Sequence, residues 1–177
     1  MRPQVPRILL TGPPRSGKTT LVCRLAEALT TSGVAVGGFV TREIREDSER
    51  VGFAVEEIGG SSALLAHVAL AEGPMVGRYH VDVTAFENLA LPAIEQVTKH
   101  RCVAIIDELG QMELFSHAFT GAFNRLLSQP IPVVATIHSR HHPVTDAIKQ
   151  RPDVELLEVH QHNADELLVR LTAQLSI

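Results

Sequence analysis

The sequence has few cysteines and no long apolar run, and both absences restrict the kind of protein that it can encode. Its two cysteines, Cys23 and Cys102, are far apart and neither belongs to a Cys-x-x-Cys pair. A metal site built on paired cysteines or a redox dithiol is therefore not expected, and separate thiols suit a reducing compartment. No apolar stretch approaches the length of a membrane span, and residues 1–6 lack the apolar core of a signal peptide. We expect a cytoplasmic protein without a membrane partner.

An excess of basic residues is also missing. The formal net charge is −4 at pH 7, whereas a general nucleic-acid binder has a basic surface, so nucleic acid is not an expected partner. Hydrophobic residues make up 45% of the chain and charged residues 20%, which favours a compact core over disorder. No linker, repeat or low-complexity segment divides the 177 residues. We predict one domain over residues 1–177.

The most informative stretch is a glycine-rich loop between an apolar segment and an amphipathic one. Its spacing, Gly-x4-Gly-Lys-Thr, is that of the phosphate-binding loop (Walker A) of nucleoside-triphosphate enzymes. Residues 7–11 predict a strand before the loop, and the apolar stripe of residues 21–29 predicts a helix after it, which is the context that the motif requires. The residues predicted to bind nucleotide are Gly12, Pro13, Pro14, Arg15, Ser16, Gly17, Lys18, Thr19 and Thr20, together with Asp107 and Glu108 further along the chain.

The residue types in this loop explain how it would hold a polyphosphate. Gly12 and Gly17 permit backbone torsions that a side chain would block, so the loop can wrap around a phosphate. Pro13 and Pro14 have no N–H group. The donors are therefore expected to be the amides of residues 15–19, at the positive end of a helix.

A second part of the site is predicted at the end of a buried strand. Residues 101–106 run apolar without alternation, as in a strand covered on both faces, and Asp107 and Glu108 follow. This is the Walker B pattern, so Thr19 and Asp107 are the predicted ligands of Mg²⁺. Lys18 is the predicted catalytic cation on the β- and γ-phosphates. Glu108 is predicted to orient the attacking water, the alternative being that it begins an exposed loop.

Further candidates come from the same sheet edge and from the arginines. Thr136 and His138 end another apolar strand and could contact the γ-phosphate or its water, although ordinary loop residues fit this pattern equally well. Arg15, Arg45 and Arg50 are candidates for a cation that stabilises transition-state charge. Arg45 is the favoured catalytic arginine, and for each of the three a salt-bridged or solvated side chain is the alternative.

Strands and helices alternate along the chain, which predicts an α/β fold with a mainly parallel sheet and its ligand site at the carboxyl ends of the strands. Residues 34–58 predict an antiparallel hairpin grafted onto the sheet, and residues 61–71 predict a short helix or an irregular segment. Asp82 or Thr84 is expected to cap a helix. Other strands are expected at 77–83, 101–106, 133–138 and 154–159, and helices at 85–100, 116–128, 144–150 and 163–175.

Several longer blocks together resemble the thermophilic-type nucleoside-triphosphatases, a family of small P-loop enzymes that includes the human cancer-related nucleoside-triphosphatase. The blocks are residues 12–20, 38–45, 50–53, 76–81, 107–116 and 133–138. Of these, 107–116 is more specific than the phosphate-binding loop alone. The chain departs from the family pattern at Gln111, where the family usually has lysine, and at Ala164, where it usually has arginine.

The resemblance implies a P-loop NTPase fold: a RecA-like three-layer sandwich with a mainly parallel sheet and an inserted β-hairpin. It also implies slow Mg²⁺-dependent hydrolysis of the terminal phosphate of ATP, GTP and other nucleoside triphosphates, with weak base selectivity. The alternative function is a P-loop kinase that transfers the γ-phosphate to an unknown acceptor. A GTPase switch is disfavoured, because residues 98–101 lack the final aspartate of the base-reading motif.

Overall fold

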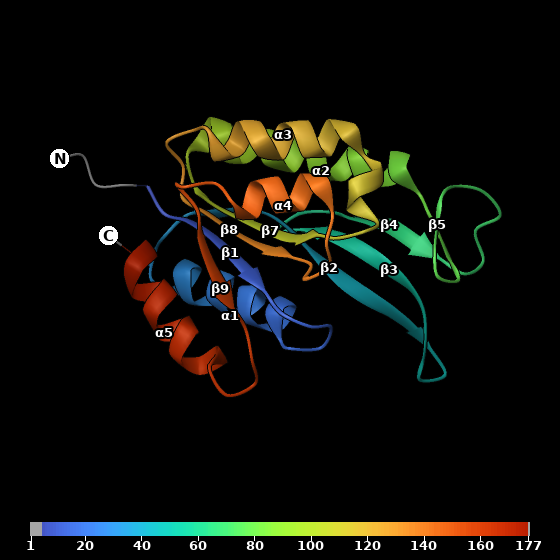
Figure 1. Ribbon diagram of the computed structural model, residues 1–177, viewed down its shortest axis with the longest axis horizontal. Helices are drawn as coiled ribbons and strands as arrows, with labels where there is room; N and C mark the ends of the chain where they lie inside the picture. Colours follow the sequence, from blue (N-terminus) through green and yellow to red (C-terminus); the bar gives the residue numbers. More distant parts are fainter. Residues whose placement is uncertain (1–4, 177) are drawn as a thin grey trace.

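Apolar strands and amphipathic helices alternate along the chain and assemble on one nine-stranded sheet (Figure 1). The computed structural model describes residues 5–176. The prediction that residues 1–6 are not a signal peptide concerns a segment whose first four residues lie outside that range. The elements are β1 (Arg7–Thr11), α1 (Lys18–Thr31), β2 (Val36–Glu46), β3 (Glu49–Glu57), β4 (Ser62–His67), β5 (Met75–Val76), β6 (Tyr79–Val81), α2 (Val83–His100), β7 (Val103–Leu109), the 3-10 helix η1 (Glu113–Phe115), α3 (His117–Leu127), β8 (Val133–Ile137), α4 (Pro143–Lys149), β9 (Glu155–Glu158) and α5 (Ala164–Leu175).

The sheet has a parallel half and an antiparallel half. Its strand order is β5-β6-β4-β3-β2-β7-β8-β1-β9. The pairs from β2 to β9 are parallel, and the pairs from β2 to β5 are antiparallel. The predicted α/β fold and the predicted hairpin, formed by β2 and β3, are confirmed. The hairpin is the start of a longer antiparallel extension, so the sheet is mixed.

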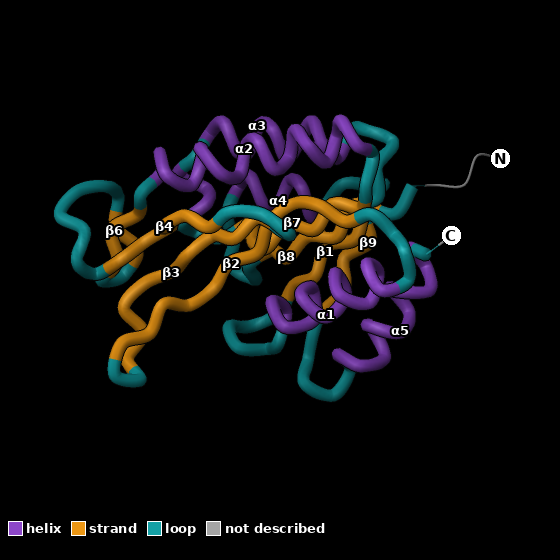
Figure 2. The backbone as a smooth tube through the Cα atoms, turned by 180° about the vertical axis from the view of Figure 1, so that it is seen from behind, coloured by secondary structure: helices purple, strands orange, loops and turns teal. Residues whose placement is uncertain are grey.

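Helices cover both faces of the sheet, as the two opposite views show (Figures 1 and 2). On one face lie α2, α3 and α4, and on the other lie α1 and α5. The position of β7 between two cores explains why its sequence shows no alternation. Ala104 and Ile106 belong to one core, and Val103 and Ile105 belong to the other. Both faces of this strand are buried, so both sets of side chains must be apolar.

The prediction for residues 61–71 was wrong, and the structure shows which of two candidate residues caps α2. The segment expected to be helical or irregular at 61–71 contains the strand β4, which pairs antiparallel with β3. Leu65 and Ala66 of β4 are fully buried, so packing on a distant segment decides its conformation. Of the two candidate caps of α2, Asp82 is the observed one, because its carboxylate accepts the Ala85 N–H at 2.8 Å.

The parallel half of the sheet brings three strand ends to one edge. The strand β8 lies between β1 and β7, and the three run in the same direction. Residues 12–17 leave β1 at this edge, Asp107 and Glu108 lie near the end of β7, and Thr136 lies near the end of β8. The carboxyl edge therefore collects the predicted site residues. Among the described residues, none of the helices has the length and apolarity needed to cross a membrane.

Candidate active site

The turn between β1 and α1 has backbone torsions that favour glycine at two positions. Gly12 has φ 147° and Gly17 has φ 96°. A Cβ atom added to Gly12 would lie 2.8 Å from both Ser16 Oγ and the Val159 carbonyl oxygen. A side chain at position 12 is therefore excluded by both torsion and space. The helix α1 begins at Lys18, so its first amide groups lack intrahelical partners and are available to an anion.

Lys18 is held over this loop by main-chain oxygens. Its Nζ donates to the carbonyl oxygens of Gly12 at 2.9 Å and Pro13 at 3.1 Å. The Ser16 N–H donates to the same Pro13 carbonyl at 3.2 Å. The Ser16 hydroxyl is buried and has no hydrogen-bond partner among the described residues. The loop thus concentrates a cation and an unpaired hydroxyl at the N-terminus of a helix.

The Asp107 carboxylate is fully buried and accepts hydrogen bonds from three threonines. Thr19 Oγ1 on α1 donates to both oxygens, at 3.0 and 3.1 Å. Thr41 on β2 donates its N–H at 3.2 Å and its hydroxyl at 3.0 Å. Thr136 on β8 donates its hydroxyl at 2.5 Å. Asp107 therefore ties the first helix to three strands, and Thr136, a candidate for contact with the γ-phosphate, binds this carboxylate.

Glu108 lies beside Asp107 and is partly buried, within β7 and not in an exposed loop. Burial and the neighbouring Asp107 raise the pKa of Glu108 to about 7, and the Lys18 cation opposes this rise. Its carboxyl group can therefore exchange a proton near neutral pH. Glu108 lines the cavity described next, together with Lys18 and Thr19.

The cavity over the loop, called the loop cavity below, has a volume of about 670 Å³. The residues that line it are Pro14, Arg15, Gly17, Lys18, Thr19, Thr20, Thr41, Arg42, Glu43, Arg50, Phe53 and Glu108. Most of the predicted nucleotide-binding residues thus face one space. Gly12, Pro13, Ser16 and Asp107 do not line it; Gly12 and Pro13 hold Lys18, and Asp107 holds Thr19.

The arginines are arranged differently from the prediction. The Arg45 guanidinium, near the turn of the β2–β3 hairpin, binds Glu43 at 2.7 and 3.0 Å and the Ser48 carbonyl at 2.9 Å, and it does not line the loop cavity. Arg50 does line it, stacked 5.1 Å from the centre of the Phe53 ring. The preference for Arg45 does not fit this geometry, because alternation along β2 gave its face but not the direction of a long side chain.

One site residue that the sequence reasoning missed is a buried acid behind Glu108. Glu113 begins η1, is 3% exposed, and accepts the Gly110 N–H at 3.1 Å. Burial and the charge of Glu108 raise the pKa of Glu113 well above its usual value. The carboxyl groups of both glutamates face the same side of Gly110. The sequence feature that could have indicated this buried acid is the position of Glu113 between two apolar residues in the block 107–116.

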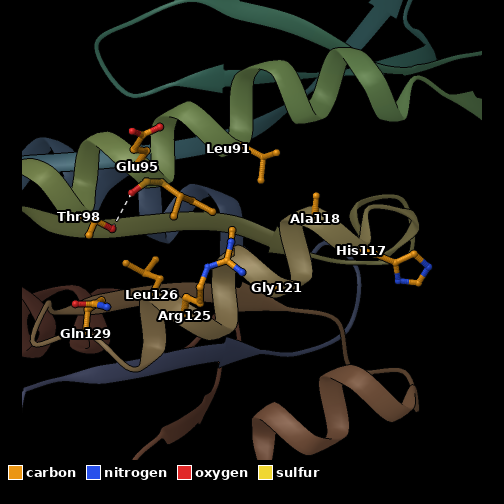
Figure 3. Close-up of a pocket in the computed structure, with 11 residues that line it drawn as sticks. Leu91, Glu95, Thr98, His117, Ala118, Gly121, Arg125, Leu126 and Gln129 are labelled. Carbon is orange, nitrogen blue, oxygen red and sulfur yellow. Dashed lines mark hydrogen bonds between the residues drawn. The ribbon is translucent and has the colours of Figure 1, made fainter.

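Two further hollows differ in their relation to this site. The first, called the side cavity below, adjoins the loop cavity and has a volume of about 210 Å³; its lining includes Glu108 and His138. His138 Nε2 shares a hydrogen bond of 3.0 Å with the Thr145 hydroxyl. The second, of about 500 Å³, lies between α2 and α3 and includes Leu91 and Arg125 (Figure 3). It contains none of the predicted site residues.

The residues present fit a magnesium ion. The Thr19 hydroxyl and the Asp107 carboxylate are oxygen donors about 3 Å apart, and oxygen is the ligand type that Mg²⁺ prefers. Nucleotide enzymes commonly supply one or two protein ligands and leave the rest to phosphates and water. Within residues 5–176 there is no cluster of three or more histidines, cysteines or acids that could hold another metal.

The chain is similar to known proteins over nearly its whole length. The model of the family described as NTPase matches residues 7–172. Nucleoside-triphosphatase THEP1 of Thermofilum pendens is 42% identical over 171 residues, which cover 95% of this chain and 94% of that protein. The human cancer-related nucleoside-triphosphatase is 38% identical over 174 residues, which cover 91% and 92%.

Solved structures show the same similarity. The crystal structure of THEP1 from the hyperthermophile Aquifex aeolicus matches with a TM-score of 0.84 at 34% identity, over 96% of this chain and 98% of that chain. The solution structure of the human cancer-related nucleoside triphosphatase matches with a TM-score of 0.82 at 37% identity, over 96% and 97%. The chain therefore belongs to the nucleoside-triphosphatase family that includes THEP1 and the human cancer-related enzyme.

Proposed function

We propose that this protein hydrolyses nucleoside 5′-triphosphates, ATP and GTP among them, to the diphosphate and phosphate, with Mg²⁺ as cofactor and weak base selectivity. One observation carries the proposal: Lys18, Thr19 and Glu108 line one cavity over the start of α1, and the buried Asp107 carboxylate accepts the Thr19 hydroxyl hydrogen bond beside it. The names of the relatives support triphosphate hydrolysis in general. The cofactor, the products and the selectivity are inferred from the chemistry of the site.

Phosphate binding is assigned to residues 12–20. The first amides of α1 face the anion, and the helix adds a partial positive charge at this end. Lys18 already lies against the loop carbonyls of Gly12 and Pro13, so it needs only a short movement to contact the β- and γ-phosphates. Arg15 also lines the loop cavity and adds positive charge where the phosphates would lie.

Thr19 and Asp107 are the residues that would hold the magnesium ion. When bound there, Mg²⁺ would supply positive charge against the negative charge that develops during transfer. Thr41 and Thr136 act through Asp107, because their hydroxyl groups fix the position of its two oxygens. A ligand carboxylate fixed in this way keeps its geometry without help from the substrate.

Glu108 is the proposed general base. Water attacks the γ-phosphorus, its proton passes to the Glu108 carboxylate, and the bond from the γ-phosphorus to the bridging oxygen of the diphosphate breaks. A carboxyl group whose pKa is about 7 is suited to this step near neutral pH. Arg50, which lines the cavity, replaces Arg45 as the proposed cation for transition-state charge.

Weak base selectivity follows from the lining of the loop cavity. Its polar groups belong to the loop, to threonines and to charged side chains, and the cations among them favour the phosphates that all nucleoside triphosphates share. Rates of phosphate release from ATP, GTP, CTP and UTP test this, each with Mg²⁺ and with excess EDTA. We expect steady release without any acceptor, kcat/KM values within about tenfold of one another, and loss of activity in EDTA. Release from a single nucleotide only, or none without an acceptor, would contradict the proposal.

A further inference from the structure

The side cavity and the loop cavity meet at Glu108, the proposed general base. Both are lined by Pro14, Thr41, Phe53 and Glu108. Of these two cavities, Lys18 and Thr19 line the loop cavity alone, whereas His138 and Arg140 line the side cavity and not the loop cavity. Glu108 therefore stands between a space that faces the phosphate-binding residues and a space that does not.

A third hollow continues the side cavity outward. This rim cavity has a volume of about 430 Å³, and it shares Val76, Gln111 and Arg140 with the side cavity. At its outer part lie Met75, 55% exposed, and Phe115, 41% exposed. The attacking water of a hydrolase needs only about 30 Å³. The side cavity alone, at about 210 Å³, offers room for a molecule several times larger.

The lining of the side cavity combines apolar side chains with polar and charged ones, among them the acids Glu108 and Glu113 and the guanidinium of Arg140. Leu65, Val76 and Met112 contribute apolar surface. Arg140 Nη1 donates to the amide oxygen of Gln111 at 3.2 Å. Among the described residues Arg140 has no carboxylate partner, whereas Arg42, Arg45, Arg50 and Arg78 are each paired with a glutamate. The Arg140 guanidinium is thus free to bind an anionic group.

We propose that the side and rim cavities bind a second substrate, a small hydroxycarboxylate, and that the protein transfers the γ-phosphoryl group to its hydroxyl. The carboxylate of this acceptor pairs with Arg140, its carbon skeleton contacts the apolar side chains, and its hydroxyl reaches Glu108. This rests on the proposed function, because it uses the same triphosphate site and the same base.

In the transfer step, one bond to phosphorus forms and one breaks. The acceptor oxygen forms a bond to the γ-phosphorus, and the bond from that phosphorus to the bridging oxygen of the diphosphate breaks. The hydroxyl proton passes to Glu108, and the nucleoside diphosphate leaves with the electrons of the broken bond. The products are a phosphate monoester and the diphosphate, and hydrolysis is the same reaction with water as the acceptor.

The test compares four probes, glycolate, L-lactate, D-glycerate and 3-hydroxybutyrate, with the neutral alcohol ethylene glycol at equal concentration. Purified protein is given ATP and Mg²⁺, and ADP, phosphate and phosphate monoester are measured separately, the ester by ³¹P NMR. We expect at least one hydroxycarboxylate to form ester about tenfold or more above ethylene glycol, the scale expected of one charged hydrogen bond.

Arg140→Ala should lower the ester-to-phosphate ratio of that probe about fivefold or more. Phosphate released by the same sample reports that the variant is folded. The matched control is Arg125→Ala, an exposed arginine that lines the α2–α3 groove (Figure 3), and its ratio should equal that of the parent.

The outcomes separate the two proposals. If the parent releases neither ADP nor phosphate, the proposed function fails and the acceptor site fails with it. If phosphate is released and none of the four probes forms ester above the ethylene glycol level, hydrolysis stands and the acceptor site is overturned. If ester forms but Arg140→Ala leaves the ratio unchanged, the proposed binding mode is overturned.

Discussion

At the scale of single residues, the Asp107 carboxylate accepts hydrogen bonds from hydroxyl groups on three secondary-structure elements. These donors are neutral, so hydrogen bonds and not ion pairs stabilise a fully buried acid. Glu108, one residue further, receives no comparable set of donors within residues 5–176, and burial and the charge of Asp107 raise its pKa to about 7. The surroundings of the two adjacent acids therefore differ, which favours different roles for them.

Replacing Glu108 by glutamine separates binding from chemistry. The amide keeps the shape of the side chain but cannot accept the proton of the attacking water, so kcat should fall about 10²-fold or more while nucleotide binding is retained. In the parent, kcat should fall as the pH drops below about 7, since protonated Glu108 cannot act as a base.

Steady-state rates from pH 5.5 to 9 and a nucleotide titration measure both effects. Lys18→Ala is the contrasting variant, because it should weaken binding as well as turnover. A Glu108→Gln enzyme with parental kcat and the same acid limb in its pH profile would remove Glu108 from the mechanism.

Local sequence was sufficient for some of these residues and not for others. Lys18 and Asp107 follow from short motifs, because both sit at fixed positions next to a strand end. Thr41 and Glu113 do not. Thr41 reaches Asp107 only because β2 pairs with β7, and Glu113 reaches Glu108 only because the chain turns back at Gly110. The direction of the Arg45 side chain was not predictable either, since contacts with Glu43 and Ser48 determine it.

At the scale of elements, the contact of β2 with β7 requires glycine at position 38. Gly38 has φ 111°, and an added Cβ would lie 2.0 Å from the Ile105 carbonyl oxygen. Gly38→Ala should therefore separate the two strands and lower the free energy of unfolding by more than the roughly 1–3 kcal/mol of a strained torsion alone.

Urea denaturation of this variant beside Gly59→Ala measures the difference. Gly59 has a similar positive φ of 74° but no atom within 4 Å of an added Cβ, so it bears only the torsional cost. Equal losses in the two variants would show that the close approach to Ile105 does not matter.

The segment that carries Glu113 should make stability depend on pH. Burial raises the pKa of Glu113 well above 4.5, so the folded protein retains a proton that the unfolded chain releases. The contribution of Glu113 to the free energy of unfolding is therefore largest below about pH 4.5 and decreases as the pH rises from there towards the raised pKa. Glu113→Gln keeps an acceptor for the Gly110 N–H but cannot ionise. Its free energy of unfolding should decrease less than that of the parent between about pH 5 and 8.

Urea denaturation at several pH values measures this dependence. Glu113→Leu is the control, because it leaves the Gly110 N–H without an acceptor and cannot ionise, so its free energy of unfolding should lie about 1–3 kcal/mol below that of Glu113→Gln throughout the range. Parallel curves for the parent and Glu113→Gln would contradict a buried, titrating Glu113.

Helices and strands were predictable from the sequence where their own hydrophobic periodicity indicates them. The strands β7 and β8 are apolar on both faces, and the helices α2, α3 and α5 show one apolar stripe, so all five were expected from periodicity. The strand β4 was not, because its conformation is decided by pairing with β3, with a register shift between Phe53 and Ala54. Local sequence does not contain that pairing.

At the scale of the whole molecule, the carboxyl edge of the sheet brings the first helix together with strands from both halves of the sheet. The loop cavity draws on α1, β2, β3 and β7, so a nucleotide bound there should stabilise the folded protein as a unit. At a hundred times its Kd, a non-hydrolysable Mg–ATP analogue should add about 2.7 kcal/mol to the free energy of unfolding. This corresponds to a rise in Tm of about 5–10 °C.

A thermal shift assay measures this rise, and excess EDTA should reduce it by removing the metal. Lys18→Ala should show little shift at the same concentration. A parental shift that Lys18→Ala and EDTA leave unchanged would mean that the analogue binds elsewhere.

The most direct measurement is a crystal structure of the protein with Mg²⁺ and a non-hydrolysable ATP analogue. We expect the triphosphate at the start of α1 with Lys18 on its terminal phosphates, the metal beside Thr19 and Asp107, and a water between Glu108 and the γ-phosphorus. A triphosphate bound in another cavity, or a metal remote from Asp107, would contradict the central claim that these residues form one hydrolytic site.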